Sequence, residues 1–290
     1  MKITEKMRQG TTLSFEVYPP KTEAGMGKLE TALDELYRWH PDWISCTYGA
    51  GGTARGRNLD ICASMRRSGR TTPATHYTCI HHSREDIASD MDEYLALPVD
   101  TVLALRGDFL PGEHETHGAF AHATGLIAFL RRTFGDRLTI ACSGIPEGHM
   151  LSSDPREDIA FLKRKQDLGA DFIVTQLTFD MDRFRRWMDE IRAAGITLPV
   201  SAGVMPVLSR DACIRHCLSM NGCAIPHALA RHISRYYDDP VGFRDAGMDY
   251  TADQLYEYLQ AGVNDLHIYA LNQSEAVDEI LRRSGLFTKD

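Results

Sequence analysis

The sequence has no long hydrophobic run. Its apolar stretches are interrupted within roughly ten residues, whereas a helix needs about 20 apolar residues to cross a bilayer. Residues 1–8 also lack the apolar core of a signal peptide. We therefore expect a cytoplasmic protein without a membrane partner.

The sequence also lacks the cysteine pattern of a disulfide framework or a structural zinc site. Its seven cysteines are an odd number, and no two of them have CxxC spacing. Reduced thiols fit this pattern better, and the core is the usual place for such side chains. Acidic and basic residues are interspersed and give a net charge of −8, which argues against a nucleic-acid partner.

Short apolar runs alternate with segments of helical periodicity along the chain. Strands are predicted at residues 13–18, 43–49, 74–80, 101–105, 138–142, 172–179, 199–204 and 265–271. Helices are predicted at residues 27–39, 54–67, 84–97, 120–134, 154–168, 181–194, 210–220, 227–237, 252–261 and 274–283. This α/β pattern predicts a single (β/α)8 barrel domain over residues 1–290, with extra helices before the last strand.

A doubly wound open sheet is the alternative fold. Such a sheet usually carries a nucleotide-binding loop after its first strand, and the sequence contains neither a GxGxxG nor a Walker motif. The chain also shows no linker or low-complexity tract that would mark a second domain. These absences favour the barrel.

The first predicted strand places one carboxylate among apolar residues. Leu13, Phe15 and Val17 share one face of this strand, whereas Ser14 and Glu16 share the other. Glu16 lies near the C-terminal end of the strand, which is the end where (β/α)8 enzymes carry out their chemistry. The alternative is a structural glutamate that pairs with an arginine on a neighbouring element.

The C-terminal ends of all the strands converge on one mouth of such a barrel. The residues at these ends are mainly polar or ionisable: Glu16, Thr47, Tyr48, His76, Arg106, Asp108, His149, Gln176 and Tyr269. This set is too polar to serve packing alone. Arg164 and Lys165, with Asp158 on the same helix, would suit an anionic ligand such as a diphosphate. The two cations are also compatible with a solvated helix face.

Nine motifs, in chain order, resemble those of the methylenetetrahydrofolate reductases: SFEVYPP, SCTYGAGG, THYTC, ALRGD, PEGH, LKRK, VTQLTFD, AGVMPV and LHIYALN. The resemblance covers residues 12–280. It implies a (β/α)8 barrel that holds FAD without a covalent bond and reduces 5,10-methylenetetrahydrofolate to 5-methyltetrahydrofolate with NADH or NADPH. The chain resembles the bacterial members of the family, which lack the C-terminal regulatory domain of the eukaryotic ones.

The resemblance implies that Glu16 is the general acid. It would protonate N10 of the folate, so that the five-membered ring opens to an N5 iminium before hydride arrives. Burial at the mouth is expected to raise its pKa. Asp108 would accept hydrogen bonds from the pterin and bias the flavin potential, and Gln176 would contact both substrates. The implied flavin-binding positions are Thr47, Tyr48, Ala50, His76, Arg106, Gly107, Asp108, His149, Asp158, Arg164 and Lys165, and Thr47 is also expected at the substrate.

Several positions depart from the family pattern, among them Met150 and Leu151, which follow His149 where Pro-Glu is common. Ile145 stands where the family usually has a tyrosine that packs on the cofactor, and Phe161 stands where a polar residue often meets the flavin. Gln273 replaces an arginine or lysine that would contact the glutamate tail of the folate. Glu16 and Asp108 are retained. We expect a variant flavin pocket and a weaker tail contact.

Two other functions stay open. The run from His76 to His82 suggests a metal-dependent barrel hydrolase, but strand alternation divides its ligand-type residues so that no face gathers three strong ligands. The second is a barrel subunit with weakened flavin binding that receives electrons from a partner protein, in view of Ile145 and Phe161. The resemblance also implies a homo-oligomer, and NADH, NADPH and a partner protein all stay open as electron donors.

Overall fold

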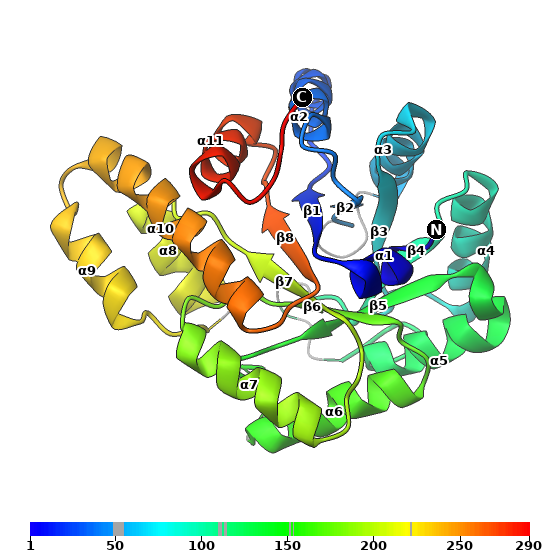
Figure 1. The fold of residues 1–290 in the computed structure, drawn as a ribbon. Helices are drawn as coiled ribbons and strands as arrows, with labels where there is room; N and C mark the ends of the chain where they lie inside the picture. Colours follow the sequence, from blue (N-terminus) through cyan, green and yellow to red (C-terminus); the bar gives the residue numbers. More distant parts are fainter. Residues whose placement is uncertain (49–54, 110–111, 113–114, 151, 153, 221) are drawn as a thin grey trace.

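Eight parallel strands form a closed barrel in the computed structural model, which describes residues 1–48, 55–109, 112, 115–150, 152, 154–220 and 222–290. The strands are β1 (Thr12–Val17), β2 (Trp43–Cys46), β3 (Thr72–Thr78), β4 (Thr101–Leu105), β5 (Thr139–Gly144), β6 (Phe172–Thr175), β7 (Val200–Val204) and β8 (Asp265–Tyr269). Each pairs with its neighbours in sequence, and β8 pairs with β1. The predicted (β/α)8 barrel is therefore confirmed (Figure 1).

Helices surround the strands and bury the apolar stripes that the sequence predicts. They are α2 (Glu23–Tyr37), α3 (Arg55–Ser68), α4 (Arg84–Ala96), α5 (Ala123–Phe134), α6 (Pro155–Asp167), α7 (Met181–Ala193) and α11 (Ser274–Ser284). In α5, for example, Leu126, Ile127 and Leu130 are fully buried. The short 3-10 helix η2 (Gly135–Arg137) follows α5.

The predicted extra helices before the last strand are also present. They are α8 (Arg210–Arg215), the π-helical turn η3 (His216–Met220), α9 (His227–Arg235) and α10 (Pro240–Gln260), and they project at one side of the barrel (Figure 1). Among the described residues, no helix combines the length and apolarity needed to cross a membrane.

Helix α10 is much longer than the predicted segment 252–261. It begins at Pro240, and Asp239 caps it by accepting a hydrogen bond of 2.9 Å from Gly242 N. Two glycines in its first half weaken the helical signal in the sequence. One of them, Gly247, lies so close to the chain after β7 that an added Cβ would come within 1.9 Å of Val207 O. Tertiary packing therefore decides the length of this helix.

Helix α1 (Ile3–Gln9) was not predicted, because seven residues offer too little periodicity. Its Ile3 and Met7 are buried among side chains of the barrel floor, including Trp43 and Phe172. Lys6 Nζ also pairs at 3.0 Å with Asp42 Oδ1, just before β2. Helix α1 thus closes the N-terminal end of the barrel.

Several strands end earlier than predicted. Strands β2, β6 and β8 stop at Cys46, Thr175 and Tyr269, where the chain turns into the loops of the mouth. After β8, Leu271 and Asn272 adopt positive φ angles of 48° and 57°, which a strand does not allow. Strand β3 covers residues 72–78 rather than 74–80.

The interior of the barrel is divided into two halves of different chemistry. The apolar half consists of Ala74, Leu103, Ala141, Phe172 and Val174, which project from β3, β4, β5 and β6. The polar half consists of Thr12, Ser14, Ser45, Ser201, Asp265 and His267, which come from β1, β2, β7 and β8. All of these side chains are buried.

Candidate active site at the barrel mouth

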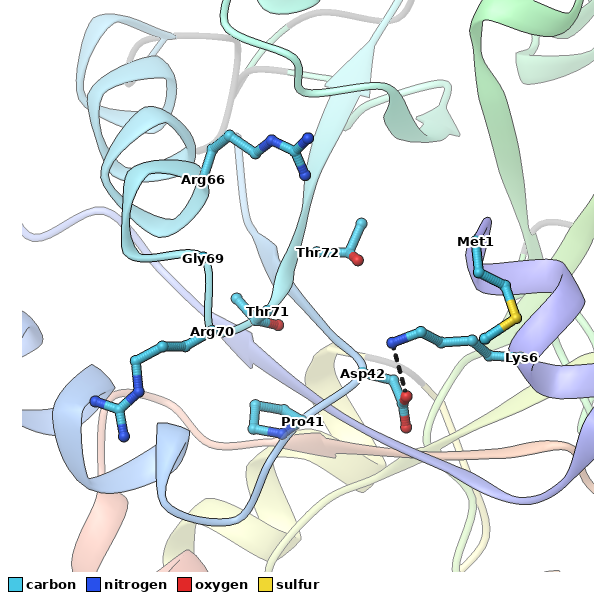
Figure 2. A pocket seen from close by; sticks show the side chains of 9 residues that line it. All are labelled: Met1, Lys6, Pro41, Asp42, Arg66, Gly69, Arg70, Thr71 and Thr72. Atoms are coloured by element: carbon cyan, nitrogen blue, oxygen red, sulfur yellow. Dashed lines mark hydrogen bonds and ion pairs between the residues drawn. The ribbon is translucent and has the colours of Figure 1, made fainter.

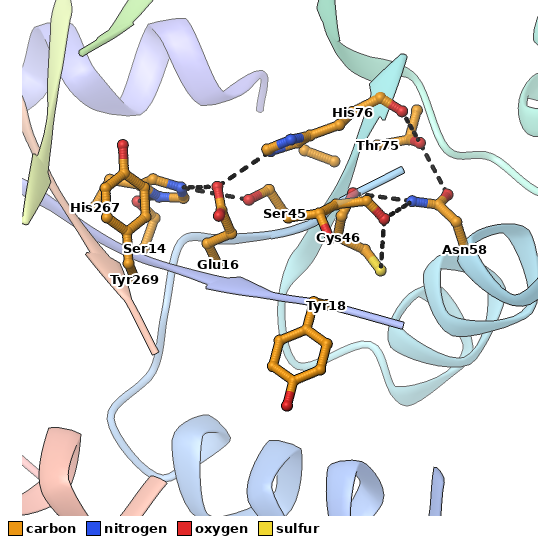
Figure 3. Close-up of polar contacts among 12 residues, drawn as sticks. Ser14, Glu16, Tyr18, Ser45, Cys46, Asn58, Thr75, His76, His267 and Tyr269 are labelled. Carbon is orange, nitrogen blue, oxygen red and sulfur yellow. Dashed lines mark hydrogen bonds and ion pairs between the residues drawn. The ribbon is translucent and has the colours of Figure 1, made fainter. Parts of the chain in front are cut away.

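Glu16 lies at the C-terminal end of β1 between two imidazoles. Its Oε2 is 3.3 Å from His76 Nε2 on β3 and 3.7 Å from His267 Nε2 on β8. The Glu16 side chain is 15% exposed, so it stands at the border between the lumen and the mouth. Figure 3 shows the carboxylate between the two rings, whereas Tyr18, beyond the strand, points away from them.

The charge state of Glu16 differs from the expectation. Burial alone raises the pKa of this carboxyl, but the nearby imidazoles of His76 and His267 outweigh burial and lower the pKa from 4.5 to about 2. The predicted rise in pKa is therefore wrong. The alternative of a partner arginine is also wrong, because the neighbours of the carboxylate are histidines from β3 and β8.

His76 brings an unsatisfied polar atom to the mouth. Its side chain is 10% exposed, and among the described residues its Nε2 has no partner with hydrogen-bond geometry despite its proximity to Glu16. The hydroxyl of Thr78, two residues further along β3, is also buried without a hydrogen-bond partner in the described part of the chain. Buried polar atoms are rarely left unpaired, so this corner of the mouth fits a polar ligand.

Asn58 on α3 fixes the end of β2 and was missed in the sequence. It is fully buried, and its Nδ2 donates to Cys46 O at 2.9 Å and to Thr47 O at 3.0 Å. Its Oδ1 accepts hydrogen bonds from Thr75 Oγ1 and Tyr94 OH at 2.9 and 2.7 Å. An asparagine on the buried face of a predicted helix was the signal that would have revealed it.

Three expected flavin positions, Thr47, Tyr48 and Ala50, lie on the segment after β2, and the structure treats each of them differently. Thr47 is half-buried at the strand end, as predicted. The ring of Tyr48 instead lies in the core, 2% exposed and with its centroid 5.0 Å from that of Tyr77. The prediction that the Tyr48 side chain lines the mouth is therefore wrong. Ala50 lies outside the described residues.

The loop after β4 packs directly on the end of β3. Gly107 has φ +93°, and an added Cβ would come within 2.9 Å of Thr78 and Ile80. Arg106 Nε donates to Gly107 O at 3.1 Å, and its guanidinium lies 5.2 Å from the centroid of Phe109. Asp108 is exposed. A carboxylate and a guanidinium thus stand beside the unsatisfied corner of β3.

The loop after β5 and helix α6 bring further charges together. Gly148 has φ +90°, and the next residue, His149, donates its backbone N–H to Asp158 Oδ2 at 2.8 Å. Burial lowers the pKa of His149, and the nearby charges of Arg106 and Lys165 lower it further. The predicted set of Arg106, His149, Asp158 and Lys165 is therefore assembled into one cluster.

The two cations of α6 behave differently. Lys165 points inward, because its Nζ donates to Ser143 O at 2.8 Å and lies 3.2 Å from Ser143 Oγ, and burial lowers its pKa. Arg164 is exposed.

Ile145 is half-buried, whereas Phe161 is 44% exposed, with its ring centroid 6.0 Å from that of His122.

Gln176 and Gln273 follow β6 and β8, which are separated by one strand in the barrel. Gln176 is half-buried after β6, and its Oε1 accepts a hydrogen bond of 2.9 Å from Leu177 N. Gln273 is an exposed residue at the start of α11. Its neighbour Asn272 donates from Nδ2 to Tyr18 O at 3.0 Å and accepts from Tyr18 N at 3.1 Å, which joins the loops after β1 and β8.

Tyr269 is the register partner of Glu16 on β8. Its hydroxyl donates to Thr175 O at 2.8 Å, and burial, together with the charge of Glu16, raises the pKa of this phenol well above its usual value. Tyr269 is thus held as a neutral donor to a backbone carbonyl.

A pocket of about 560 Å³ lies at the opposite end of the barrel, near the starts of β2 and β3 (Figure 2). Its lining includes Lys6, Asp42, Arg66, Arg70 and Thr72. In (β/α)8 barrels this end serves stability, whereas the chemistry occurs at the C-terminal ends of the strands. The pocket is therefore separate from the candidate site.

The residues that suggested a metal site are not gathered. His76 is on β3, but that strand ends at Thr78, so His82 does not extend the same face. Within the described ranges, no group of three or more His, Cys, Asp and Glu side chains is placed to hold a metal ion.

The fold and the site together define a (β/α)8 barrel protein with an acid–base cluster and a cationic loop cluster at its C-terminal face. Residues 2–285 match the family model described as methylenetetrahydrofolate reductase, and the chain belongs to that family.

Comparison with known proteins supports this assignment. The chain is 33% identical to methylenetetrahydrofolate reductase 1 of Schizosaccharomyces pombe over 298 residues, which cover 100% of this chain and 49% of the relative. It is 30% identical to the 5,10-methylenetetrahydrofolate reductase of Pectobacterium carotovorum, over 94% of this chain and 90% of the relative. The chain therefore spans about half the length of the yeast relative and nearly all of the bacterial one.

A solved structure of an uncharacterized protein from Clostridium thermocellum, which binds two copies of 5-methyl-5,6,7,8-tetrahydrofolic acid, has the same fold. The TM-score is 0.65 at 11% sequence identity, and the alignment covers 98% of this chain and 99% of the other.

Proposed function

We propose that this protein reduces 5,10-methylenetetrahydrofolate to 5-methyltetrahydrofolate with a reduced nicotinamide, NADH or NADPH, through bound FAD. The observation that carries the proposal is the position of Glu16, a carboxylate at the mouth with an imidazole on either side, in a chain of this family. Opening of the folate ring needs a proton at N10, and this cluster is built to hold and move one.

The proton is supplied by the cluster rather than by Glu16 alone. Because the neighbouring histidines hold the pKa of Glu16 at about 2, its carboxyl is ionised in the free protein, and a neighbouring imidazole would have to pass it the proton. Glu16 takes this proton from His76 or His267 and passes it to N10, which makes that nitrogen a better leaving group. One proton is consumed for each methylene group reduced, and it returns to the cluster from solvent.

The loop cluster fits the cofactor that the family uses. Arg106 and Lys165 add positive charge beside His149, and such a set suits a diphosphate. The unsatisfied atoms His76 Nε2 and Thr78 Oγ1 are positioned for polar groups of a bound ring. A flavin held by these residues would supply the hydride chemistry between the nicotinamide and the methylene carbon.

Two further side chains are assigned to the folate. The exposed carboxylate of Asp108 would accept hydrogen bonds from the pterin amino and ring N–H groups, and Gln176 across the mouth would orient the substrates. Ile145 would offer the flavin an aliphatic contact in place of an aromatic one. Gln273, neutral and exposed, would contact the glutamate tail only weakly.

The test is the visible absorption spectrum of the purified protein without oxygen. We expect a flavin band that bleaches with NADH or NADPH and returns when methylenetetrahydrofolate is added. The Glu16→Gln variant should bleach normally but reoxidise about 10² to 10⁴-fold more slowly, because the proton donor is lost. Glu30→Gln, at an exposed position on α2, is the matched control and should behave as the parent.

Two results would overturn the proposal. Normal reoxidation of the Glu16→Gln variant by the folate would remove the acid role. A colourless protein that takes up no added FAD would favour instead a barrel subunit that depends on a partner for electrons.

A further inference from the structure

The lumen contains a second carboxylate that the proposed chemistry does not use. Asp265, at the start of β8, is fully buried near the barrel floor, far from any mouth loop. Thr12 Oγ1, Ser14 Oγ, Ser201 Oγ and Trp43 Nε1 donate to it at 2.5, 2.6, 2.6 and 3.3 Å. Such a heavily bonded carboxylate is unusual in a barrel core, which packing alone would fill with apolar side chains.

The four hydrogen bonds at Asp265 match an ionised carboxylate. Each oxygen of the carboxylate receives two donors, Thr12 and Trp43 on Oδ1 and Ser14 and Ser201 on Oδ2. An ionised carboxylate offers about four acceptor sites, which these four donors fill, whereas a proton on Oδ2 would reverse the hydrogen bond with Ser14 or Ser201. Burial raises the pKa of Asp265, and the charge of His267 and the three hydroxyl donors counteract only part of this rise.

Through Ser14, the ionised state of Asp265 determines which nitrogen of His267 carries a hydrogen. The single hydroxyl proton of Ser14 is given to Asp265, so the Ser14 oxygen can only accept at His267 Nδ1, which lies 2.7 Å away. His267 Nδ1 must therefore carry a hydrogen. The other nitrogen, Nε2, is then the one that gains or loses a proton, and it faces Ser45 Oγ at 3.3 Å and Glu16 Oε2 at 3.7 Å.

The other neighbours of the His267 ring pack against it but do not accept the proton of its Nε2. The His267 ring stacks on Trp43, with centroids 4.4 Å apart and planes inclined by 6°. Tyr269 meets it edge-on at 5.7 Å, with its hydroxyl already bonded to Thr175 O. On β7, the register partner of His267 is Gly203, which has no side chain. Among the described residues, Asp265 and Glu16 are thus the charged groups that bracket His267, on its floor side and its mouth side.

We propose that Asp265 is a positioning residue for proton delivery, which acts through Ser14 to fix the tautomer of His267 so that Nε2 exchanges its proton with Glu16. The inference deepens the proposed function and rests on it. Asp265, Ser14, His267 and Glu16 form one column in the polar half of the lumen, from floor to mouth. Within this column one proton passes from His267 Nε2 to Glu16 Oε2 and from there to N10, while Asp265 stays ionised and Ser14 keeps its hydroxyl proton. This is the same logic by which a carboxylate orients a catalytic or metal-bound histidine through its second nitrogen.

The tautomer can be measured without any activity. In protein labelled with ¹⁵N at histidine, imidazole nitrogen shifts distinguish Nδ1–H from Nε2–H, and His267→Gln identifies the signal. We expect Nδ1–H in the parent protein. The Ser14→Ala variant removes the acceptor and should lose this preference. A parent protein with His267 as the Nε2–H tautomer would overturn the inference, whether or not the protein reduces folate.

Ser201 offers a matched control for kinetics. Ser14 and Ser201 each donate to Asp265 Oδ2 at 2.6 Å, but of the two only Ser14 has a hydrogen bond to His267. Ser14→Ala and Ser201→Ala should therefore lose similar stability. We expect Ser14→Ala to slow flavin reoxidation by methylenetetrahydrofolate about 10- to 100-fold and to shift its pH profile. Ser201→Ala should stay within about twofold of the parent, with a superimposable profile.

The reductive step separates positioning from general damage. Flavin reduction by the nicotinamide does not use the column, so both variants should keep its rate. Equal effects of Ser14→Ala and Ser201→Ala on reoxidation would overturn the inference. If the parent protein shows no flavin chemistry, the proposed function fails, and the tautomer measurement still decides the role of Asp265 and Ser14.

Discussion

The two halves of the barrel lumen are filled by different kinds of side chain, apolar in one half and hydrogen-bonded polar in the other. On β3 to β6, Ala74, Leu103, Ala141, Phe172 and Val174 fill the interior by contact alone. On the other four strands, serine, threonine, histidine and aspartate fill the same volume and are joined by hydrogen bonds. The apolar half needs only shape complementarity, whereas the polar half needs every donor to meet an acceptor.

The polar side chains of the barrel also differ between its floor and its mouth. At the floor, Asp265 is saturated with donors. At the mouth, His76 Nε2 and Thr78 Oγ1 have no hydrogen-bond partner in the described part of the chain. Saturated groups hold a fixed charge and geometry, while unsatisfied ones are available to a ligand. This contrast distinguishes residues that position other side chains, at the floor, from residues that are available to bind a ligand, at the mouth.

The largest effect is expected in the apolar half. Phe172→Ala should destabilise the protein by about 3–5 kcal/mol, because a fully buried ring is replaced by a cavity beside Trp43 and α1. Urea unfolding at pH 6 and pH 8 should give the same loss, since no charge is involved. A loss that depends on pH would show that the two halves are electrostatically coupled.

The polar half should show its effect in acid. The folded-state pKa of Glu16, about 2, lies below its ordinary value of 4.5, so the unfolded state binds the proton more tightly. The stabilisation is complete above pH 4.5 and is lost as the pH falls towards 2, by on the order of 3 kcal/mol. Urea unfolding between pH 6 and pH 3 should show a steeper decline for the parent than for Glu16→Gln. Parallel curves would contradict the lowered pKa.

A smaller effect is expected at the junction between the barrel and α3. Asn58→Ala should cost about 2 kcal/mol, because the hydroxyls of Thr75 and Tyr94 and the carbonyls of Cys46 and Thr47 lose their partner. Thermal unfolding measures the loss. Asn58→Asp is the matched variant, because it retains the acceptor for the hydroxyls but removes the donor to the carbonyls. Full stability of both variants would show that Asn58 does not hold the end of β2.

The smallest effect is expected in cofactor affinity. Lys165→Met should weaken FAD binding about tenfold, or roughly 1.4 kcal/mol, since a cation beside His149 is lost. Lys163→Met is the control, because Lys163 pairs with Asp167 on the same helix. Quenching of FAD fluorescence on titration gives both dissociation constants. Equal constants for the two variants would place the diphosphate away from Lys165.

Local patterns explain which parts of the fold were predictable. Alternation along 13–17 correctly placed Glu16 on the lumen face, and helical spacing correctly identified the stripes of α2 and α5. Helix α1 was missed because seven residues carry little periodicity, and half of α10 was missed because glycines obscured it. Both elements are stabilised by contacts with residues distant in sequence, at the barrel floor for α1 and after β7 for α10.

The residues of the candidate site also include some that the sequence predicted correctly and one that it misplaced. Strand-end position alone was enough to nominate Glu16, His76, Arg106 and His149, which the structure brings to one mouth. Strand-end position wrongly placed the Tyr48 side chain at the mouth. Strand β2 ends at Cys46, and the ring of Tyr48 packs near Tyr77 in the core instead. Which side of the chain a residue faces is a local property within a strand and ceases to be one in the loop that follows.

The sequence by itself determined the (β/α)8 architecture, the family and the presence of an acid at the end of the first strand, because periodicity and motif order are written along the chain. Only the tertiary structure decided the charge of that acid. His267 comes from the last strand and His76 from the third, and closure of the barrel places both against Glu16. A pKa depends on distances between charges in space, which the spacing of residues along the chain does not reveal.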